Sequence, residues 1–330
     1  MTLSPTFTPE QLADFCRRAF PECAEPAISG ASILPSRQHE MIAFEMTAAR
    51  AEGGPVRKQL VLRRYVSTLS WWRPDDRGKA QREATICAWL HGLGLPAPDV
   101  YLREFGPWGD VVLFSRVAGR ELLAQRASLS EVVGPHIDAF ARLLARLHRL
   151  SPPEEVRRVV PRVSLPGALA NLAAMAAAID QPELYGAVER VLELAYDVPE
   201  LGPVLVHGDY HLLNARFDGE AISGLLDWEY AALGDPRWDV ANAYMQLVDF
   251  GAAEAADRFL STYLAESGWE FEGAPLYNIA VPLQQWTVSE WLVQRQQRGD
   301  ALGFALAQEL IDLRDAHRDR AETALQWLGR

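Results

Sequence analysis

A group of polar side chains near the middle of the chain has the types and spacing to bind a metal ion and to move a proton. Asp209 and Asn214 are five residues apart and follow a short apolar run, and Asp227 follows the next pair of apolar runs. Carboxylate and amide oxygens are ligands that suit a hard divalent cation such as Mg2+. A carboxylate beside such a metal could also orient an attacking hydroxyl group and accept its proton. These are the parts that phosphoryl transfer needs.

Short strands are expected to position these side chains, because the polar residues stand at the ends of apolar runs. We expect strands over residues 204–206, 215–217 and 221–226, with a hairpin turn at Asp218 and Gly219. The polar stretch 152–162 is interpreted as a loop. Helical periods surround this short β region, and they fall at about 134–150, 167–180, 183–196, 236–249, 252–266, 276–296 and 300–328.

The first part of the chain has a different pattern, with short apolar runs separated by turn-forming residues. Thr8, Pro9 and Gln11 are typical of the start of a helix, which is expected to run to about residue 20. Further elements are expected in the order strand, strand, strand, helix, strand, strand, near 27–33, 41–47, 57–65, 79–93, 100–103 and 111–115. The sequence therefore predicts an α+β protein with a small β-rich N-terminal lobe, residues 1–118, and a larger helical C-terminal lobe, residues 119–330.

Composition and charge exclude several classes of protein. Hydrophobic residues make up 49% of the 330 residues and charged residues 23%, which is the balance of a folded chain. The net charge of −12 argues against nucleic acid as a partner. Residues 200–330 hold 21 acidic and 9 basic side chains, which favours a cationic ligand or a metal, with a solvated acidic surface as the alternative. Because no apolar run is long enough to span a membrane and residues 1–20 hold no secretory-type stretch, we expect a cytoplasmic protein.

Three motifs together resemble the aminoglycoside phosphotransferase and choline kinase family. They are the segments 207–214 (HGDYHLLN), 225–230 (LLDWEY) and 234–239 (GDPRWD). The similarity covers most of the chain, since residues 144–148 are similar to the helix before the family's catalytic loop and residues 57–119 to its small lobe. The resemblance implies a protein-kinase-like, two-lobed fold with ATP in the cleft between the lobes.

The resemblance also implies roles for individual residues of these motifs. Asp209 would be the catalytic base, and Asn214 and Asp227 would hold Mg2+ on the nucleotide phosphates. His207 would brace the loop by hydrogen bonding, and Asp239 would brace it from the following helix.

Three further motif residues receive a structural role or none. Asp235 stands before a proline and is interpreted as the N-cap of the helix that follows. Glu229 and Tyr230 are similar to the choline kinase version of the motif, and the sequence assigns them no role.

In the small lobe, the resemblance assigns Arg63 and Glu83 to the ion pair that meets the nucleotide phosphates. Strand neighbours point to opposite faces, so Arg63 and Arg64 cannot both enter the cleft, and we expect Arg63 to do so. An arginine keeps its charge and can contact phosphate through two nitrogens, so the family's more usual lysine is not required.

Two other small-lobe segments are expected to contact the nucleotide. The family's loop over the phosphates often contains glycines, whereas residues 34–38 of this chain read Leu-Pro-Ser-Arg-Gln. Ser36 is expected to donate a hydrogen bond to phosphate in place of backbone groups. Ser115 to Val117 resembles the hinge that contacts adenine, so both residues are candidates for nucleotide binding.

These observations predict an ATP- and Mg2+-dependent phosphotransferase that phosphorylates a hydroxyl group of a small molecule. The acidic C-terminal segment favours a cationic acceptor of the aminoglycoside, choline or amino-alcohol type, while sugars, amino acids, macrolides and hydroxyacyl thioesters stay open. Four aromatic residues there are candidates for contacting a quaternary ammonium group, with core positions as the alternative: Trp269, Tyr277, Trp286 and Trp291. The oligomeric state is not legible in the sequence.

Two other functions compete with this prediction. A catalytically idle kinase-like protein that binds nucleotide or a partner as a scaffold is favoured by the altered phosphate loop. A protein kinase is disfavoured, because the chain has His-Gly-Asp and Asp-Trp-Glu where those enzymes have His-Arg-Asp and Asp-Phe-Gly. The segment between Asp227 and Asp239 is also too short for an activation loop.

Overall fold

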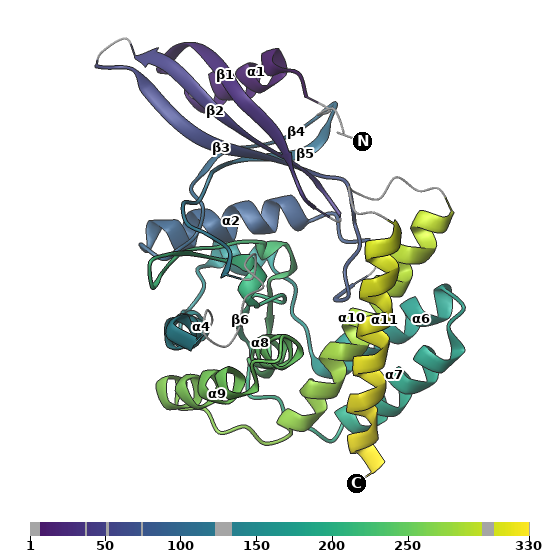
Figure 1. Ribbon diagram of the computed structural model, residues 1–330. Coiled ribbons are helices and arrows are strands. Elements are labelled where there is room, and N and C mark those ends of the chain that lie inside the picture. Colours follow the sequence, from purple (N-terminus) through teal and green to yellow (C-terminus); the bar gives the residue numbers. More distant parts are fainter. Residues whose placement is uncertain are drawn as a thin grey trace.

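A computed structural model of the chain describes residues 7–36, 38–50, 53–73, 75–122, 134–298 and 307–329. The strands and helices separate into an N-terminal lobe built on a sheet and a C-terminal lobe built from helices (Figure 1). This is the two-lobed α+β fold that the sequence predicts. Three expected features fall partly outside the described residues: Arg37 of the expected phosphate loop, residue 52 of a turn expected between the strands near 41–47 and 57–65, and residues 300–306 of the last expected helix.

The N-terminal lobe is a five-stranded antiparallel sheet with the strand order β1-β2-β3-β5-β4. Its strands are β1 (Cys23–Leu34), β2 (Glu40–Arg50), β3 (Val56–Tyr65), β4 (Val100–Gly106) and β5 (Gly109–Ser115). Helix α1 (Pro9–Ala19) packs on this sheet and begins with the predicted capping box, in which Thr8 and Gln11 exchange hydrogen bonds. Helix α2 (Lys79–Gly92) lies between the sheet and the C-terminal lobe (Figure 1).

The C-terminal lobe surrounds two short β ladders with helices. Its helices are α4 (Ile137–His148), α5 (Glu154–Val159), α6 (Leu165–Ala178), α7 (Pro182–Ala195), α8 (Arg237–Asp249), α9 (Ala253–Ser267), α10 (Ala274–Gln297) and α11 (Ala307–Leu325). The ladders pair β6 (Val204–Val206) with β9 (Ala232–Gly234) and β7 (Ala215–Asp218) with β8 (Ala221–Leu225). Among the described residues, no helix combines the length and the apolar character needed to cross a membrane.

Helix α5 shows that the loop interpretation of residues 152–162 is wrong. Glu154 stands in its first turn and Arg157 and Arg158 in its last, an arrangement that suits the helix dipole. Glu154 also forms ion pairs with both arginines. Apolar periodicity does not reveal this six-residue helix, because Val156 is its one buried residue. Strand β9 was likewise not predicted, since its three residues form a strand only by pairing with β6.

The segment between β3 and α2 packs into the C-terminal lobe. Trp71 and Trp72 are buried in the same core as residues of α6, α7 and α10. Leu69 packs with Leu292 of α10, and the ring of Trp71 stacks on Tyr230 with a centroid separation of 3.7 Å. The two lobes are therefore joined by shared apolar packing as well as by the chain itself.

Candidate active site

The loop after β6 is braced by Asp239, a buried residue of α8. The backbone N–H groups of His207 and Gly208 donate to the Asp239 carboxylate at 2.6 and 2.8 Å. His148 Nε2 of α4 lies 3.2 Å from the same carboxylate. Gly208 has φ 81°, and a Cβ atom there would collide with the backbone of Tyr230, so this turn requires glycine. The brace predicted for Asp239 is confirmed.

His207 ties the loop to the chain segment that leads to Asp227. Its Nε2 lies 2.9 Å from the carbonyl oxygen of Leu226, and its Nδ1 accepts a hydrogen bond from the N–H of Asp209 at 3.3 Å. These contacts place the proton on Nε2. Burial lowers the pKa of His207 despite nearby Asp239, so the ring is neutral at pH 7. The bracing role predicted for this histidine is confirmed.

Both carboxylate oxygens of Asp209 have partners on the same loop. Asn214 Nδ2 donates to Oδ2 at 3.2 Å and to the Asp209 carbonyl at 3.0 Å. His211 Nε2 lies 3.2 Å from Oδ1. Burial raises the pKa of Asp209, but His211, His207 and the Asn214 hydrogen bond outweigh it and hold that pKa below its usual range. Asp209 is therefore an oriented, ionised carboxylate at neutral pH.

Asp227 follows β8, on a segment that is hydrogen-bonded to the backbone of Asn214. The N–H of Leu226 donates to the carbonyl of Asn214 at 2.8 Å, which brings the two segments together. Asp227 has φ 69° and ψ 53°, a left-handed conformation that is strained by about 1–3 kcal/mol in a residue with a Cβ and that concentrates at functional sites. The Asn214 amide donates through its nitrogen to Asp209, so its oxygen is the atom that could serve as a metal ligand. This oxygen donor set fits a hard divalent cation.

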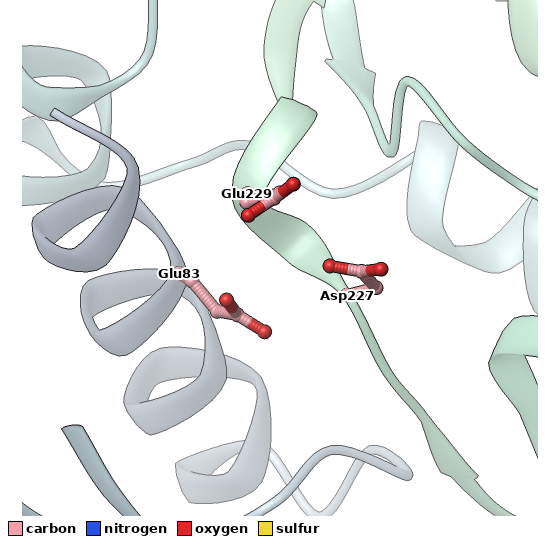
Figure 2. Close-up of side chains that lie close together, drawn as sticks. All are labelled: Glu83, Asp227 and Glu229. Carbon is pink, nitrogen blue, oxygen red and sulfur yellow. The ribbon is translucent and has the colours of Figure 1, made fainter. Parts of the chain in front are cut away.

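Arg63 of β3 contacts three carboxylates at the junction of the lobes. Its Nη1 lies 2.9 Å from Glu83 and 2.8 Å from Asp227, and its Nη2 lies 2.7 Å from Glu229. Figure 2 shows these carboxylates close together, Glu83 from α2 and the other two from the segment after β8; their oxygens lie within 4.8 Å of one another. The arginine side chain supplies the positive charge of this cluster.

Arg63 enters this junction and Arg64 does not, so only one of the two neighbours does so, as strand alternation predicts, and it is the one expected. Arg64 lies on the opposite face of β3, where its Nε is 3.0 Å from the carboxylate of Glu40. Glu83 also accepts a hydrogen bond from the hydroxyl of Tyr65 on the same strand. The predicted Arg63–Glu83 ion pair is present and buried.

The residues expected to contact the nucleotide directly make other contacts in this structure. Ser36 Oγ accepts a hydrogen bond from the N–H of His39 at 3.2 Å and so closes the turn between β1 and β2. Ser115 Oγ accepts a hydrogen bond at 2.9 Å from the N–H of the residue before β4. The side chain of Val117 packs against Gly224, where a Cβ atom would collide with it. Their nucleotide contacts stay predictions.

The aromatic residues proposed as ammonium contacts belong to the cores. Tyr277 and Trp286 are buried in the core that α10 shares with α6 and α7. Trp269 and Trp291 are partly buried and pack against two other clusters. The core alternative is therefore the observed one.

The N-cap predicted at Asp235 is wrong by one position. Pro236 occupies the N-cap of α8, and no side chain caps it. The carboxylate of Asp235 accepts the N–H of Arg237 at 2.9 Å and pairs with its guanidinium at 2.6 Å. It also accepts the N–H of Leu201 at 3.0 Å, so it fastens the start of α8 to the segment before β6.

Sequence reasoning missed the residues that surround Glu229. His39 Nε2 forms a hydrogen bond with the Glu229 carboxylate, and Lys79 Nζ lies 3.4 Å from it. The hydroxyl of Tyr230 lies 2.8 Å from Gln38 Oε1, again joining the turn after β1 to the segment after β8. These pairs are 150 to 192 positions apart in the chain, so no local pattern could have indicated them.

Known proteins share this architecture across nearly the whole chain. A candidate aminoglycoside phosphotransferase from Ralstonia eutropha JMP134 superposes with a TM-score of 0.70 at 17% identity, covering 97% of this chain and 98% of that one. A thermostable mutant of aminoglycoside phosphotransferase APH(4)-Ia, solved with ADP and hygromycin B, gives 0.62 at 16% identity, covering 96% and 98%. Spectinomycin phosphotransferase APH(9)-Ia, solved with ADP and spectinomycin, gives 0.62 at 13% identity, covering 97% and 98%.

At these identities the superpositions establish the fold, and the family follows from the sequence itself. The model of the phosphotransferase enzyme family matches residues 49–277, a range that contains the three central motifs and the Arg63–Glu83 pair. The chain therefore belongs to the phosphotransferase enzyme family and is a small-molecule O-phosphotransferase.

Proposed function

We propose that the protein is an ATP- and Mg2+-dependent phosphotransferase that phosphorylates a hydroxyl group of a small cationic molecule. The observation that carries the proposal is Asp209, ionised and hydrogen-bonded to Asn214 on a braced loop, to which the segment of Asp227 and its partner Arg63 is joined by a backbone hydrogen bond. The nucleotide would bind between an N-terminal lobe of residues 1–118 and a C-terminal lobe of residues 119–330.

Each polar group of the site has a distinct part in this reaction. Asp209 orients the acceptor hydroxyl and takes its proton as the new O–P bond forms, while the bond between the γ-phosphorus and the bridging oxygen of ATP breaks and ADP leaves. Asn214 and Asp227 would hold Mg2+, which when bound screens the charge of the nucleotide phosphates. Arg63, fixed by Glu83, binds phosphate oxygens through its guanidinium.

The nucleotide would run from the hinge to the turn after β1. Ser115 and Val117 would meet the adenine through backbone groups, and Ser36 would lie near the phosphates. Relatives solved with ADP or AMP-PNP support an adenine nucleotide as the phosphoryl donor.

The acceptor is proposed to be of the aminoglycoside, choline or amino-alcohol type. The relatives bound to hygromycin B and spectinomycin support a hydroxylated small molecule. The excess of acidic side chains in residues 200–330 supports a cation, because such a region raises the local concentration of positive ligands.

A catalytically idle scaffold is the second candidate, and the turn at residues 34–38, which has no glycine, favours it. A protein kinase is disfavoured further by the structure. The chain from Asp227 to Asp239 forms a 3-10 turn, β9 and the first residues of α8, which occupies the whole segment with no activation loop.

The test measures acceptor-dependent ADP release over a panel of hydroxylated amines, sugars and antibiotics. We expect Mg·ATP to raise the melting temperature of the wild type and one acceptor class to be turned over. Asp209→Asn should lower kcat by about 10^3-fold and keep the thermal shift, since a positioned base contributes about 10^2–10^4. Asp218→Asn, in the exposed β7–β8 turn, is the matched control. Unchanged turnover in Asp209→Asn would rule out Asp209 as the catalytic base. If Mg·ATP does not raise the melting temperature of the wild type, nucleotide binding is ruled out.

A further inference from the structure

Glu229 is nearly fully buried and contacts three basic side chains. Its Oε2 accepts hydrogen bonds from Arg63 Nη2 at 2.7 Å and from His39, and its Oε1 lies 3.4 Å from Lys79 Nζ. Removing such a charge would leave buried cations without their partner, so the group is held firmly in place.

Glu229 supplies the second acceptor that an arginine needs at this position. A guanidinium presents two terminal nitrogens in one plane, whereas a lysine presents a single ammonium group. Glu83 of α2 accepts from Nη1 of Arg63 and Glu229 accepts from Nη2, so one glutamate from each lobe fixes that plane. Asp227 also accepts from Nη1, so without Glu229 both remaining contacts would lie on one nitrogen and the guanidinium could rotate about it.

His39 extends the hold of Glu229 to the turn between β1 and β2. The N–H of Val66 donates to His39 Nδ1 at 3.2 Å, so Nε2 carries the proton that points to Glu229. The backbone N–H of His39 in turn donates to Ser36 Oγ at 3.2 Å. The turn is thus fixed by side-chain contacts, in a stretch where the chain has no glycine.

We propose that Glu229 is a positioning residue for the phosphate half of the nucleotide site. It orients the guanidinium of Arg63 together with Glu83, and through His39 it anchors the turn after β1. The inference rests on the proposed function, because it requires the nucleotide phosphates to bind beside Arg63. It gives a role to a motif residue that the sequence left without one.

The test compares the binding of Mg·AMP-PNP and of adenosine by isothermal titration calorimetry. Adenosine lacks phosphates and therefore reports the rest of the site. Glu229→Gln keeps the side-chain shape and loses the charge. We expect this variant to raise the Kd for Mg·AMP-PNP about tenfold, whereas the Kd for adenosine should stay within about twofold of the wild-type value. In an Arg63→Lys background the same change should raise the Kd less than about threefold, because a lysine cannot bridge both glutamates.

Two further variants keep the test decisive. His39→Gln weakens the contact between Glu229 and the turn after β1. This variant takes the place of Glu229→Gln in the test if Glu229→Gln does not fold. We expect it to raise the Kd for Mg·AMP-PNP about fivefold. Glu40→Gln is the matched control, a buried glutamate that pairs with Arg64 on the other face of the sheet, and it should change neither Kd.

Several results would overturn the positioning role. They are an unchanged Kd for Mg·AMP-PNP in Glu229→Gln and His39→Gln, an equal loss of adenosine binding, or a full tenfold effect of Glu229→Gln in the Arg63→Lys background. Wild-type protein that binds adenosine and Mg·AMP-PNP equally would overturn the proposed function as well, since no phosphate site would then exist.

Discussion

Two buried clusters of ionisable groups position the candidate site, and they are built in different ways. The cluster at Asp239 lies wholly within the C-terminal lobe and uses two backbone N–H groups and His148 as donors. The cluster at Arg63 joins β3 and α2 of the N-terminal lobe to Glu229 of the C-terminal lobe through charged side chains.

The two clusters differ in what fixes their geometry. Backbone donors are fixed by the fold, so the loop that carries Asp209 is complete within one lobe. Long side chains hold one another only while the lobes are docked, so the geometry around Arg63 follows their relative position. The protein thus fixes the loop that carries Asp209 within one lobe and assembles the cluster at Arg63 across the interface between the lobes.

The largest effect is expected from Asp239→Asn, which breaks the cluster at Asp239 that is held by backbone N–H groups. The amide of Asn has one acceptor oxygen, whereas the carboxylate of Asp239 accepts from three donors through two oxygens. At least one buried N–H group would therefore lose its partner. We expect the free energy of unfolding to fall by about 3 kcal/mol and kcat to fall as the loop with Asp209 loosens. Urea denaturation and acceptor-dependent ADP release measure the two effects.

Asp235→Asn is the matched control for this change. Asp235 is also a buried carboxylate in the C-terminal lobe, and its partners are Arg237 and Leu201 instead of the catalytic loop. We expect it to lower stability and to leave kcat per folded molecule unchanged. A normal kcat in Asp239→Asn would show that the brace contributes stability alone.

The cross-lobe cluster should make stability depend on pH through Glu83. Burial, together with the charges of Asp227 and Glu229, outweighs the opposing charge of Arg63 and raises the pKa of Glu83 from 4.5 to about 7. The folded protein then holds a proton that the unfolded chain releases between pH 4.5 and 7, so the contribution of Glu83 to stability falls as pH rises through this window.

Calorimetric melting of Glu83→Gln tests this dependence. The melting temperature of the wild type minus that of the variant should decrease by about 2–4 °C between pH 5 and pH 7.5. Glu154→Gln is the control: hydrogen bonds from Arg157 and Arg158 lower the pKa of this exposed carboxyl, so its own titration lies below the window. A constant difference for Glu83→Gln would place its folded-state pKa at the ordinary value.

The sequence predicts the cluster at Asp239 well and the cluster at Arg63 only in part. Asp239, His207 and Asp209 lie within neighbouring motifs, and the resemblance of these motifs to the family implied the roles of the three residues. Strand alternation, a rule that acts over neighbouring residues, excluded the entry of both Arg63 and Arg64, and the resemblance pointed to Arg63. Such features are readable because they depend on nearby positions.

The partners of Glu229 could not be predicted, because they depend on how the lobes meet. His39 lies 190 positions away and Lys79 lies 150, and neither belongs to a motif. The same reason explains strand β9, which exists through its pairing with β6, and the aromatic residues of α10, whose burial depends on packing by α6 and α7. Burial by distant elements is the property that the sequence pattern does not contain.

The smallest effect is expected where the lobes meet through apolar packing. Trp72 is buried, and its indole N–H donates to the carbonyl of Tyr230, the residue after Glu229. Trp72→Phe removes this hydrogen bond and part of the ring, and we expect the free energy of unfolding to fall by about 1–2 kcal/mol in urea denaturation. The Kd for Mg·AMP-PNP should stay within about twofold, because the charged contacts of Glu229 do not involve this indole.

Trp71→Phe is the control for the hydrogen bond itself. Trp71 is buried next to Trp72 and stacks on Tyr230, yet among the described residues its indole N–H has no hydrogen-bond partner. Since both variants lose the same atoms, the stability of Trp72→Phe should be lower than that of Trp71→Phe by about 1 kcal/mol, the net value of one hydrogen bond. Equal losses would mean that packing alone joins the lobes here, and a large rise in the Kd of Trp72→Phe would mean that the charged cluster depends on the aromatic contact beside it.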